Sequence, residues 1–299
     1  MKIVKTQGLV AAPPTGFTED GALDMAVVAP LATHLERQGL VGVFVNGTTG
    51  EGSSLTVEER ETLAAEWRRT LPPRLRLFIH VGHNCIEDAC RLARHAQAIK
   101  ADATACIAPF FFKPEGMDQL VAWCAAVAGA APGVPFYYYH MPAKSGVTPK
   151  IAQFIEAAAQ CIPNFAGVKF TFEALDDFLE SLRLAGGRYD LLWGRDEMLL
   201  SALAVGAGGG VGSTYNIAAP LYLRIIESFE AGDFAQAREW QARAVELIQT
   251  MKQSGNFFSV IKAILRAQGV PITPVVRPPQ VSLSQAEAAG QRCLEIIEK

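Results

Sequence analysis

The sequence predicts an α/β fold, a closed (β/α)8 TIM barrel with a C-terminal helical extension. Eight short apolar runs alternate with longer amphipathic segments, and the starts of successive runs lie 19 to 34 residues apart. One strand, one helix and their loops take about 30 residues, so this spacing indicates eight βα units. A doubly wound open sheet is the alternative, which is disfavoured because no G-x-G-x-x-G motif follows the first run.

The eight apolar runs are the expected strands. Most of them are too short to be helices and are bounded by Gly, Pro or Asn, which is typical of strands. They span residues 8–12, 41–46, 75–81, 102–108, 135–140, 167–171, 190–194 and 209–213.

The segments between the runs carry recognisable helix ends. Thr56 and Glu59 predict a capping box, in which the two residues satisfy each other's free backbone N–H groups. Thr148 before Pro149 predicts a helix that starts with the proline in its first turn. Glycines stand where helices are expected to end, at Gly186, Gly187 and Gly232.

We expect the chain to consist of the barrel, residues 1–232, and a C-terminal helical extension, residues 233–299. Amphipathic stretches in the extension predict three helices, over 233–253, 256–268 and 283–298. No low-complexity segment or long linker separates the two parts.

The composition narrows the class of protein. With 27 Lys and Arg against 30 Asp and Glu, the net charge is −3, which argues against a nucleic-acid binder or a polybasic membrane binder. No apolar run has the length of a membrane-spanning helix and no cleavable signal is visible, so we expect a cytoplasmic protein. The six cysteines include no C-x-x-C pair and are expected to be reduced thiols, with no metal site.

Candidate catalytic residues follow the strands, because such a barrel has its active site at the C-terminal ends of its strands. Lys169 ends the sixth run, where burial would lower its pKa and provide a free amine for Schiff-base formation. The alternative is a lysine that extends to solvent. Tyr139 lies near the end of the fifth run and could transfer a proton, whereas packing between barrel and helices is the expected role of two of the three tyrosines 137–139.

Two loops could hold a substrate. Residues 46–51 expose backbone N–H groups and the hydroxyls of Thr48 and Thr49, which makes a nest for a carboxylate; an ordinary glycine-rich turn is the alternative. The glycines before Ser213 allow a ligand to approach the backbone closely.

Two pairs of polar residues have simpler interpretations. Asp196 and Glu197 follow the seventh run, where acidic residues often stabilise a helix start. His80 and His83 have no third ligand nearby in the sequence, so we expect them to be structural.

Four motifs in strand order resemble the pyruvate-dependent class I aldolases, the family of dihydrodipicolinate synthase and N-acetylneuraminate lyase. They are G-T-T-G-E after the second run, Y-x-x-P after the fifth, G-x-K in the sixth and G-S-T-Y-N after the eighth. The resemblance extends from Gly8 to about Pro279 and is closer to the lyases, as in the stretches 44–52, 135–143 and 211–216.

This resemblance implies a reaction and a set of roles. The enzyme would cleave N-acetylneuraminate reversibly to pyruvate and N-acetylmannosamine, without a metal or organic cofactor, and would form a homotetramer. Lys169 would form the Schiff base, and Tyr139 would take the proton of the C4 hydroxyl as the C3–C4 bond breaks. Thr48 and Thr49 would bind the pyruvyl carboxylate. The sugar end would be lined by Thr171, Gly194, Asp196, Glu197, Ser213 and Phe257.

Departures from the family pattern leave alternatives open. Three phenylalanines, 110–112, stand where the synthases carry a relay tyrosine, which favours a lyase. Lys144 stands where lyases tend to have leucine and synthases arginine; it either binds a second carboxylate or lies at the surface. The alternatives are dihydrodipicolinate synthase or another 2-keto-3-deoxy sugar acid aldolase or dehydratase and, from a different class, a non-catalytic sugar-acid sensor.

Overall fold

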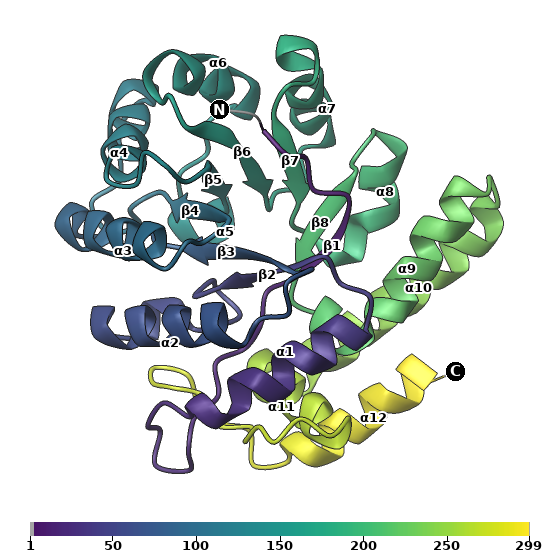
Figure 1. Cartoon of the computed structure of the whole chain (residues 1–299). Coiled ribbons are helices and arrows are strands. Elements are labelled where there is room, and N and C mark those ends of the chain that lie inside the picture. The colour runs from purple at the N-terminus through teal and green to yellow at the C-terminus, as the bar shows by residue number, and fades with distance from the viewer. Residues whose placement is uncertain (1–2, 299) are drawn as a thin grey trace.

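Eight parallel strands close into a barrel in the computed structural model, which describes residues 3–298 (Figure 1). Each strand pairs with its neighbour in sequence, and β1 pairs with β8 to close the sheet. The barrel and the eight predicted strands are confirmed, and the open-sheet alternative is excluded. The strands are β1 (Gly8–Ala11), β2 (Gly42–Val45), β3 (Arg76–His80), β4 (Ala103–Ile107), β5 (Phe136–His140), β6 (Phe165–Phe170), β7 (Asp190–Trp193) and β8 (Gly209–Gly212).

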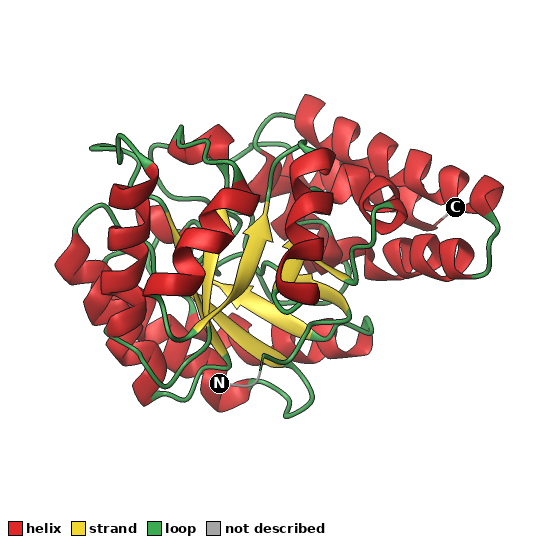
Figure 2. Cartoon of the chain, turned by 90° about the horizontal axis from the view of Figure 1, so that it is seen from above, coloured by secondary structure: helices red, strands yellow, loops and turns green. Residues whose placement is uncertain are grey.

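Helices cover the outside of the barrel, and Figure 2 shows them surrounding the strands. Short 3-10 turns lie at Met25–Val27, Gly52–Ser54, Leu184–Gly186 and Asp196–Met198. The helices of the barrel are α1 (Val28–Arg37), α2 (Val57–Thr70), α3 (Ile86–Ala98), α4 (Met117–Gly129), α5 (Pro142–Ser145), α6 (Ile151–Cys161), α7 (Leu175–Arg183), α8 (Leu199–Ala204) and α9 (Tyr215–Glu230).

Alternation along the strands divides the apolar side chains into two layers. Tyr137 and Tyr139 point into the barrel, where they pack with Phe44 and Phe78. Tyr138 points outward and belongs to the larger core between the barrel and the helices. The predicted alternation of the three tyrosines is therefore confirmed, and it places Tyr139 on the inner face.

Helix ends agree with the sequence in most cases. Thr56 and Glu59 form the predicted capping box at the start of α2. Gly187 and Gly232 adopt left-handed backbone angles just after helical segments, with φ of 75° and 76°. These positions favour glycine because a side chain there would be strained.

The predicted start of the sixth helix at Thr148 and Pro149 is wrong. Helix α6 begins at Ile151, three residues after Thr148. The reason is a cap from another helix: the Asp177 carboxylate of α7 accepts hydrogen bonds from the backbone N–H groups of Ile151, at 2.7 Å, and Ala152, at 3.0 Å.

The C-terminal extension consists of the three predicted helices, α10 (Phe234–Gln253), α11 (Phe257–Ala267) and α12 (Ala286–Glu298). Helix α10 packs along α9, and α12 packs on α11 and α10. Figure 1 shows α9 and α10 side by side, with α11 and α12 beneath α1. The boundary at residue 232 stays a prediction.

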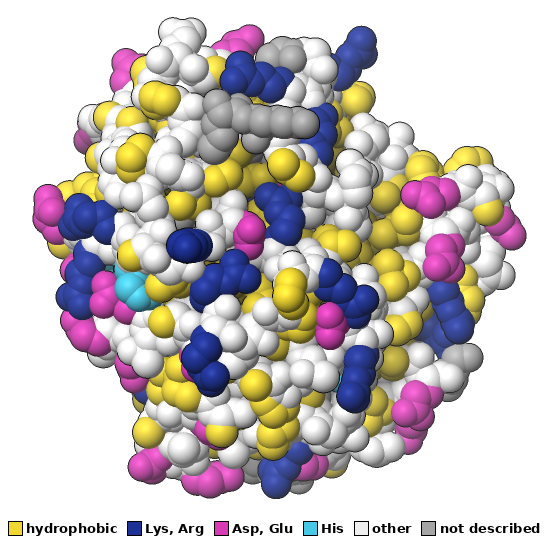
Figure 3. Space-filling model, viewed as in Figure 1, with side chains coloured by type: hydrophobic (Ala, Val, Ile, Leu, Met, Phe, Trp, Pro, Cys, Tyr) yellow, Lys and Arg dark blue, Asp and Glu magenta, His cyan; other side chains and the backbone are white. Residues whose placement is uncertain are grey.

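The charged side chains on the surface and the state of the cysteines agree with what the composition predicts. On the face drawn in Figure 3, basic and acidic side chains are interspersed with hydrophobic and neutral ones. No helix within residues 3–298 is long and apolar enough to span a membrane. All six cysteines are free thiols, as predicted.

Candidate active site

A cavity of about 430 Å³ lies at the C-terminal ends of the strands. The structure brings all ten predicted site residues to its wall, from β2, β5, β6, β7, β8 and the extension. They are Lys169, Tyr139, Thr48, Thr49, Thr171, Gly194, Asp196, Glu197, Ser213 and Phe257.

Lys169 lies on β6 in register with Tyr139 of β5, and its side chain is buried. Its Nζ atom lies 3.9 Å from the centre of the Phe44 ring and 4.1 Å from that of Tyr139. Burial lowers the pKa of Lys169 to about 7, although the Asp196 carboxylate opposes this shift. The amine is therefore available near neutral pH, and the alternative of a solvent-extended lysine is wrong.

Tyr139 places its phenol beside this amine. Its hydroxyl lies 3.2 Å from Thr48 Oγ1 and donates to Met141 Sδ at 2.9 Å. Burial raises the pKa of Tyr139 to about 12, and the hydrogen bond with Thr48 opposes the shift. The phenol is thus protonated at neutral pH and suits a relay better than a permanent base.

The other two tyrosines have packing roles. Tyr137 donates a hydrogen bond to Asp190 Oδ2 at 2.8 Å, at the opposite end of the barrel from the cavity. The ring of Tyr138 packs on Phe154 of α6, with 4.5 Å between the ring centres. The expected packing between barrel and helices is confirmed for Tyr138, whereas Tyr137 packs inside the barrel.

The loop of residues 46–54 joins β2 to α2 and carries Thr48 and Thr49 to the cavity. Thr49 Oγ1 lies 2.7 Å from Ser213 Oγ, which joins this loop to the end of β8. Thr15 Oγ1 donates to the carbonyl oxygen of Gly50 at 2.6 Å. Hydroxyl groups from two strand ends therefore meet at the cavity wall.

Two carboxyl groups after β7 also line the cavity. Asp196 is buried and accepts hydrogen bonds from Thr214 N at 2.8 Å and Thr214 Oγ1 at 2.6 Å. Burial raises the pKa of Asp196 to about 6, while the bonds from Thr214 oppose the shift. Glu197 lies 3.3 Å from Arg195 and 3.5 Å from Lys252. The two acids thus have different partners: Thr214 donates hydrogen bonds to Asp196, whereas Glu197 pairs with two cations.

Thr171 and Gly194 form a tight contact in the cavity wall. A Cβ atom at Gly194 would lie 2.0 Å from Thr171 Oγ1, so only glycine fits there. That hydroxyl oxygen is buried near the Tyr139 phenol, whose pKa it lowers, but within residues 3–298 it forms no hydrogen bond of normal geometry. Since a buried hydroxyl normally has a partner, this atom is a candidate ligand contact.

The sequence interpretation missed several cavity residues. Lys252 and Ile248 reach the cavity from α10, and Met141 reaches it from the end of β5. For Lys252 and Ile248, the only sequence signal was the periodicity that predicted α10. Periodicity predicts a helix but not what the helix packs against. Lys144 on α5 is exposed and borders the cavity, so both interpretations of this residue stay predictions.

His80 has a structural role, as expected. Its ring is buried, with Nδ1 3.0 Å from the carbonyl oxygen of Asn46. Burial and the nearby Arg60 guanidinium lower the pKa of His80 well below its usual value. His83 forms a separate contact, with its Nδ1 atom 3.4 Å from Asp88 Oδ2.

Comparisons with known proteins agree with this geometry. The chain matches the Dihydrodipicolinate synthetase family over residues 5–295. It is 40% identical to the N-acetylneuraminate lyase of Mus musculus over 298 residues, which cover 98% of this chain and 93% of the relative. The structure of the Proteus mirabilis N-acetylneuraminate lyase matches with a TM-score of 0.94 and 38% identity, over 98% of both chains.

A third match is a prophage protein of the dihydrodipicolinic acid synthase family from E. coli K12, solved in complex with pyruvate. It has a TM-score of 0.88 and 26% identity, over 98% of this chain and 99% of that one. The family model and the relatives each span nearly the whole chain, barrel and extension together. This chain therefore belongs to the dihydrodipicolinate synthetase family.

Proposed function

We propose that this protein is a Schiff-base aldolase that cleaves N-acetylneuraminate reversibly to pyruvate and N-acetylmannosamine. The observation that carries the proposal is the placement of Lys169 and Tyr139 side by side on neighbouring strands, at the wall of one cavity. Similarity to lyases of that name over nearly the full length supports the choice of substrate.

The reaction begins when the neutral amine of Lys169 attacks the C2 ketone and water leaves, which gives an imine. The protonated imine withdraws electrons, so the C3–C4 bond can break to an enamine instead of a bare carbanion. As the C4 oxygen becomes the aldehyde of N-acetylmannosamine, Tyr139 takes the C4 hydroxyl proton and passes its own phenol proton to the substrate carboxylate bound by Thr48. The carboxylate then delivers this proton to C3 of the enamine, and hydrolysis of the imine releases pyruvate and regenerates the Lys169 amine.

The cavity wall supplies the remaining contacts. Thr48 and Thr49 bind the carboxylate next to the ketone, together with backbone N–H groups of their loop. The polyol end of the substrate lies along polar groups at the ends of β6, β7 and β8, and Phe257 covers the acetamido group. These polar residues are Thr171, Gly194, Asp196, Glu197 and Ser213.

A second candidate is a related condensation or cleavage in which the other substrate carries its own carboxylate. Lys144 and Lys252 at the cavity wall favour it, since each could pair with an anion. The lyase remains the first proposal because Asp196 and Glu197 would repel an anionic group at that end of the cavity.

Borohydride trapping followed by intact mass measurement tests the proposal. Wild-type protein incubated with pyruvate should gain the mass of one reduced adduct, and Lys169→Ala should gain none while keeping its fold. Pyruvate release should then be measured with N-acetylneuraminate and 2-keto-3-deoxygluconate, with the synthase condensation in parallel. A wild type that gains no mass would identify a sensor, and synthase activity above lyase activity would overturn the substrate assignment.

We also propose that the enzyme works in the cytoplasm as a homotetramer, with small 2-keto acids as its ligands and no nucleic-acid or membrane partner. The low content of charged residues, 19%, supports extra buried interface. The imine chemistry requires no cofactor, because the protonated imine itself is the electron sink.

A further inference from the structure

The 46–54 loop borders two adjoining cavities. Thr48 and Thr49 face the cavity of Lys169. A second cavity of about 320 Å³ is bordered by Asn46, Gly47, Thr48 and residues 51–54, and it adjoins the first at Thr48, Tyr139, Lys144 and Phe258. Because open space borders much of the loop, packing alone does not fix the position of the two threonines.

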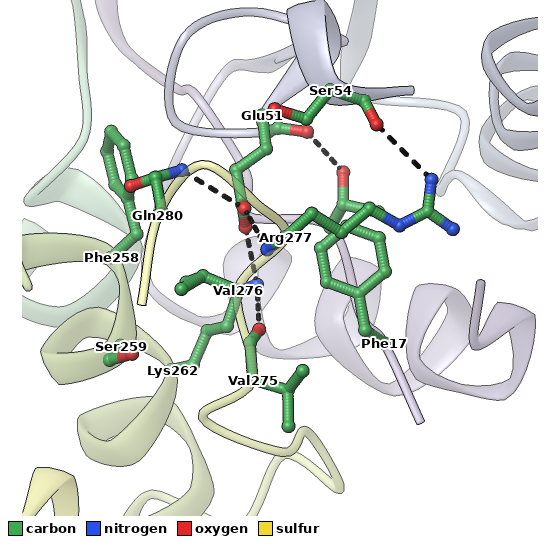
Figure 4. Close-up of polar contacts among 12 residues, drawn as sticks. Phe17, Glu51, Ser54, Phe258, Ser259, Lys262, Val275, Val276, Arg277 and Gln280 are labelled. Carbon is green, nitrogen blue, oxygen red and sulfur yellow. Dashed lines mark hydrogen bonds and ion pairs between the residues drawn. The ribbon is translucent and has the colours of Figure 1, made fainter. Parts of the chain in front are cut away.

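The carboxylate of Glu51 anchors this loop to the C-terminal extension (Figure 4). Its Oε1 atom accepts a hydrogen bond from Lys262 Nζ of α11 at 2.7 Å. Its Oε2 atom accepts from Arg277 N at 2.9 Å and from Gln280 Nε2 at 3.1 Å. Three donors from residues more than 200 positions away in the sequence therefore meet on one loop side chain.

Both charged side chains of this ion pair are fully buried. Lys262 Nζ also donates to the carbonyl oxygen of Val275 at 2.6 Å and lies 4.5 Å from the centre of the Phe17 ring. Removing two charges from water is costly, and a hydrophobic pair would often be at least as stable. Stability alone is thus a poor explanation for an ion pair at this place.

The backbone of the loop needs support at both ends. Asn46 and Glu51 have left-handed backbone angles, with φ of 60° and 53°, which are uncommon for residues other than glycine. Asn46 Nδ2 donates to the carbonyl oxygen of Arg60 at 3.0 Å. Such conformations persist where surrounding contacts fix them, and at Glu51 the contacts are the ion pair and its two companion donors.

We propose that the Glu51–Lys262 ion pair is a positioning device, which holds Thr48 and Thr49 where they bind the carboxylate of the keto acid. The inference rests on the proposed function. Neither charged group lines the cavity of Lys169, and Glu51 borders only the second cavity, so the pair acts through the loop. Helix α11 thereby becomes part of the carboxylate site without touching the carboxylate.

The test compares two ketones that differ in the carboxylate. Borohydride trapping on Lys169 is timed with pyruvate and with its neutral ester, methyl pyruvate, and intact mass distinguishes the two adducts. In Glu51→Gln and in Lys262→Met, the second-order trapping rate with pyruvate should fall roughly tenfold or more. The rate with methyl pyruvate should stay within about twofold of wild type, because the reactive amine is untouched.

Asp190→Asn is the matched control. Asp190 is also a buried carboxylate with three donors, Thr6 N, Thr6 Oγ1 and Tyr137 Oη, but it lies at the other end of the barrel. Its substitution should leave the ratio of the two trapping rates unchanged. Gln280→Ala removes one partly exposed donor to Glu51 and provides a milder variant if the others fail to fold; it should lower the same ratio.

Three outcomes would overturn the inference. One is a folded variant whose ratio of rates equals that of wild type, and another is an equal loss with both ketones, which indicates general damage. The third is an Asp190→Asn ratio that falls as far as that of Glu51→Gln. A wild type that traps neither ketone would instead overturn the proposed function itself.

Discussion

At the scale of single residues, the surroundings of Lys169 decide its charge. The amine faces the Phe44 and Tyr139 rings, and no carboxylate within residues 3–298 forms an ion pair with it. Burial therefore outweighs the more distant attraction of Asp196, and the pKa falls to about 7. The same shift lowers stability at neutral pH, and this cost disappears as the pH rises toward the unfolded-state pKa of about 10.4.

Schiff-base formation should follow this pKa. Only the neutral amine attacks the ketone, so the trapping rate with pyruvate should be low in acid, rise through pH about 7 and then level off. The measurement is the trapping rate from about pH 5.5 to about pH 9.5, a range that brackets the shifted value but not the ordinary one. A rate that still rises steeply at the upper limit would mean that Lys169 keeps the pKa of an ordinary lysine.

A variant of Tyr139 should distinguish imine formation from cleavage of the C3–C4 bond. Tyr139→Phe keeps the ring that packs on Phe44 but removes the hydroxyl that, in the proposed mechanism, takes the C4 proton. We expect kcat for N-acetylneuraminate cleavage to fall about 10²-fold or more, as for loss of a general acid–base group, while pyruvate is still trapped. Tyr138→Phe, on the outer face of the same strand, is the control. An unchanged kcat in Tyr139→Phe would remove this residue from the mechanism.

At the scale of elements, sequence patterns correctly predicted the features that depend on residues close together in the chain. The eight apolar runs and the capping box at Thr56 depend on residues close in sequence, and the structure confirms both. The predicted start of α6 was wrong because the residue that caps the helix, Asp177, lies 26 residues from Ile151. Periodicity and capping rules carry no information about such a partner.

The Asp177 cap should contribute measurably to stability. Its buried carboxylate satisfies two backbone N–H groups of α6, so Asp177→Ala should lower the free energy of unfolding by about 2 kcal/mol. Asp176→Ala is the matched control, since Asp176 is adjacent and exposed. Urea unfolding of the two variants measures the difference. Equal midpoints would show that water replaces the carboxylate without loss.

At the scale of the whole molecule, the extension and the barrel build one site. The sequence predicted the strand-end residues of the cavity, since parallel strands place their ends together. It did not predict that α10 contributes Lys252, or that Lys262 pairs with Glu51 across 211 positions. Phe257 came only from the resemblance to the family. Contacts between distant segments follow from how whole helices pack, which one sequence does not show.

We predict that copies of this chain associate through the loop after β4. Phe111 and Phe112 are 75% and 85% exposed, and their rings contact each other with 4.9 Å between centres. Adjacent apolar rings in water are costly, and burial of such rings is typical of the centre of protein interfaces. These two residues are thus the strongest candidates for the subunit contact of the proposed homotetramer.

Light scattering after size-exclusion chromatography tests this contact. The wild type should have four times the 32.2 kDa mass of one chain. Phe111→Ser combined with Phe112→Ser should reduce the mass to that of a dimer or monomer, because burying each ring contributes about 1.5–3 kcal/mol that serine cannot supply. Val281→Ser, which changes a side chain 78% exposed elsewhere, should leave the mass unchanged. A monomeric wild type would contradict the tetramer, whereas a double variant that stays tetrameric would place the contact on another surface.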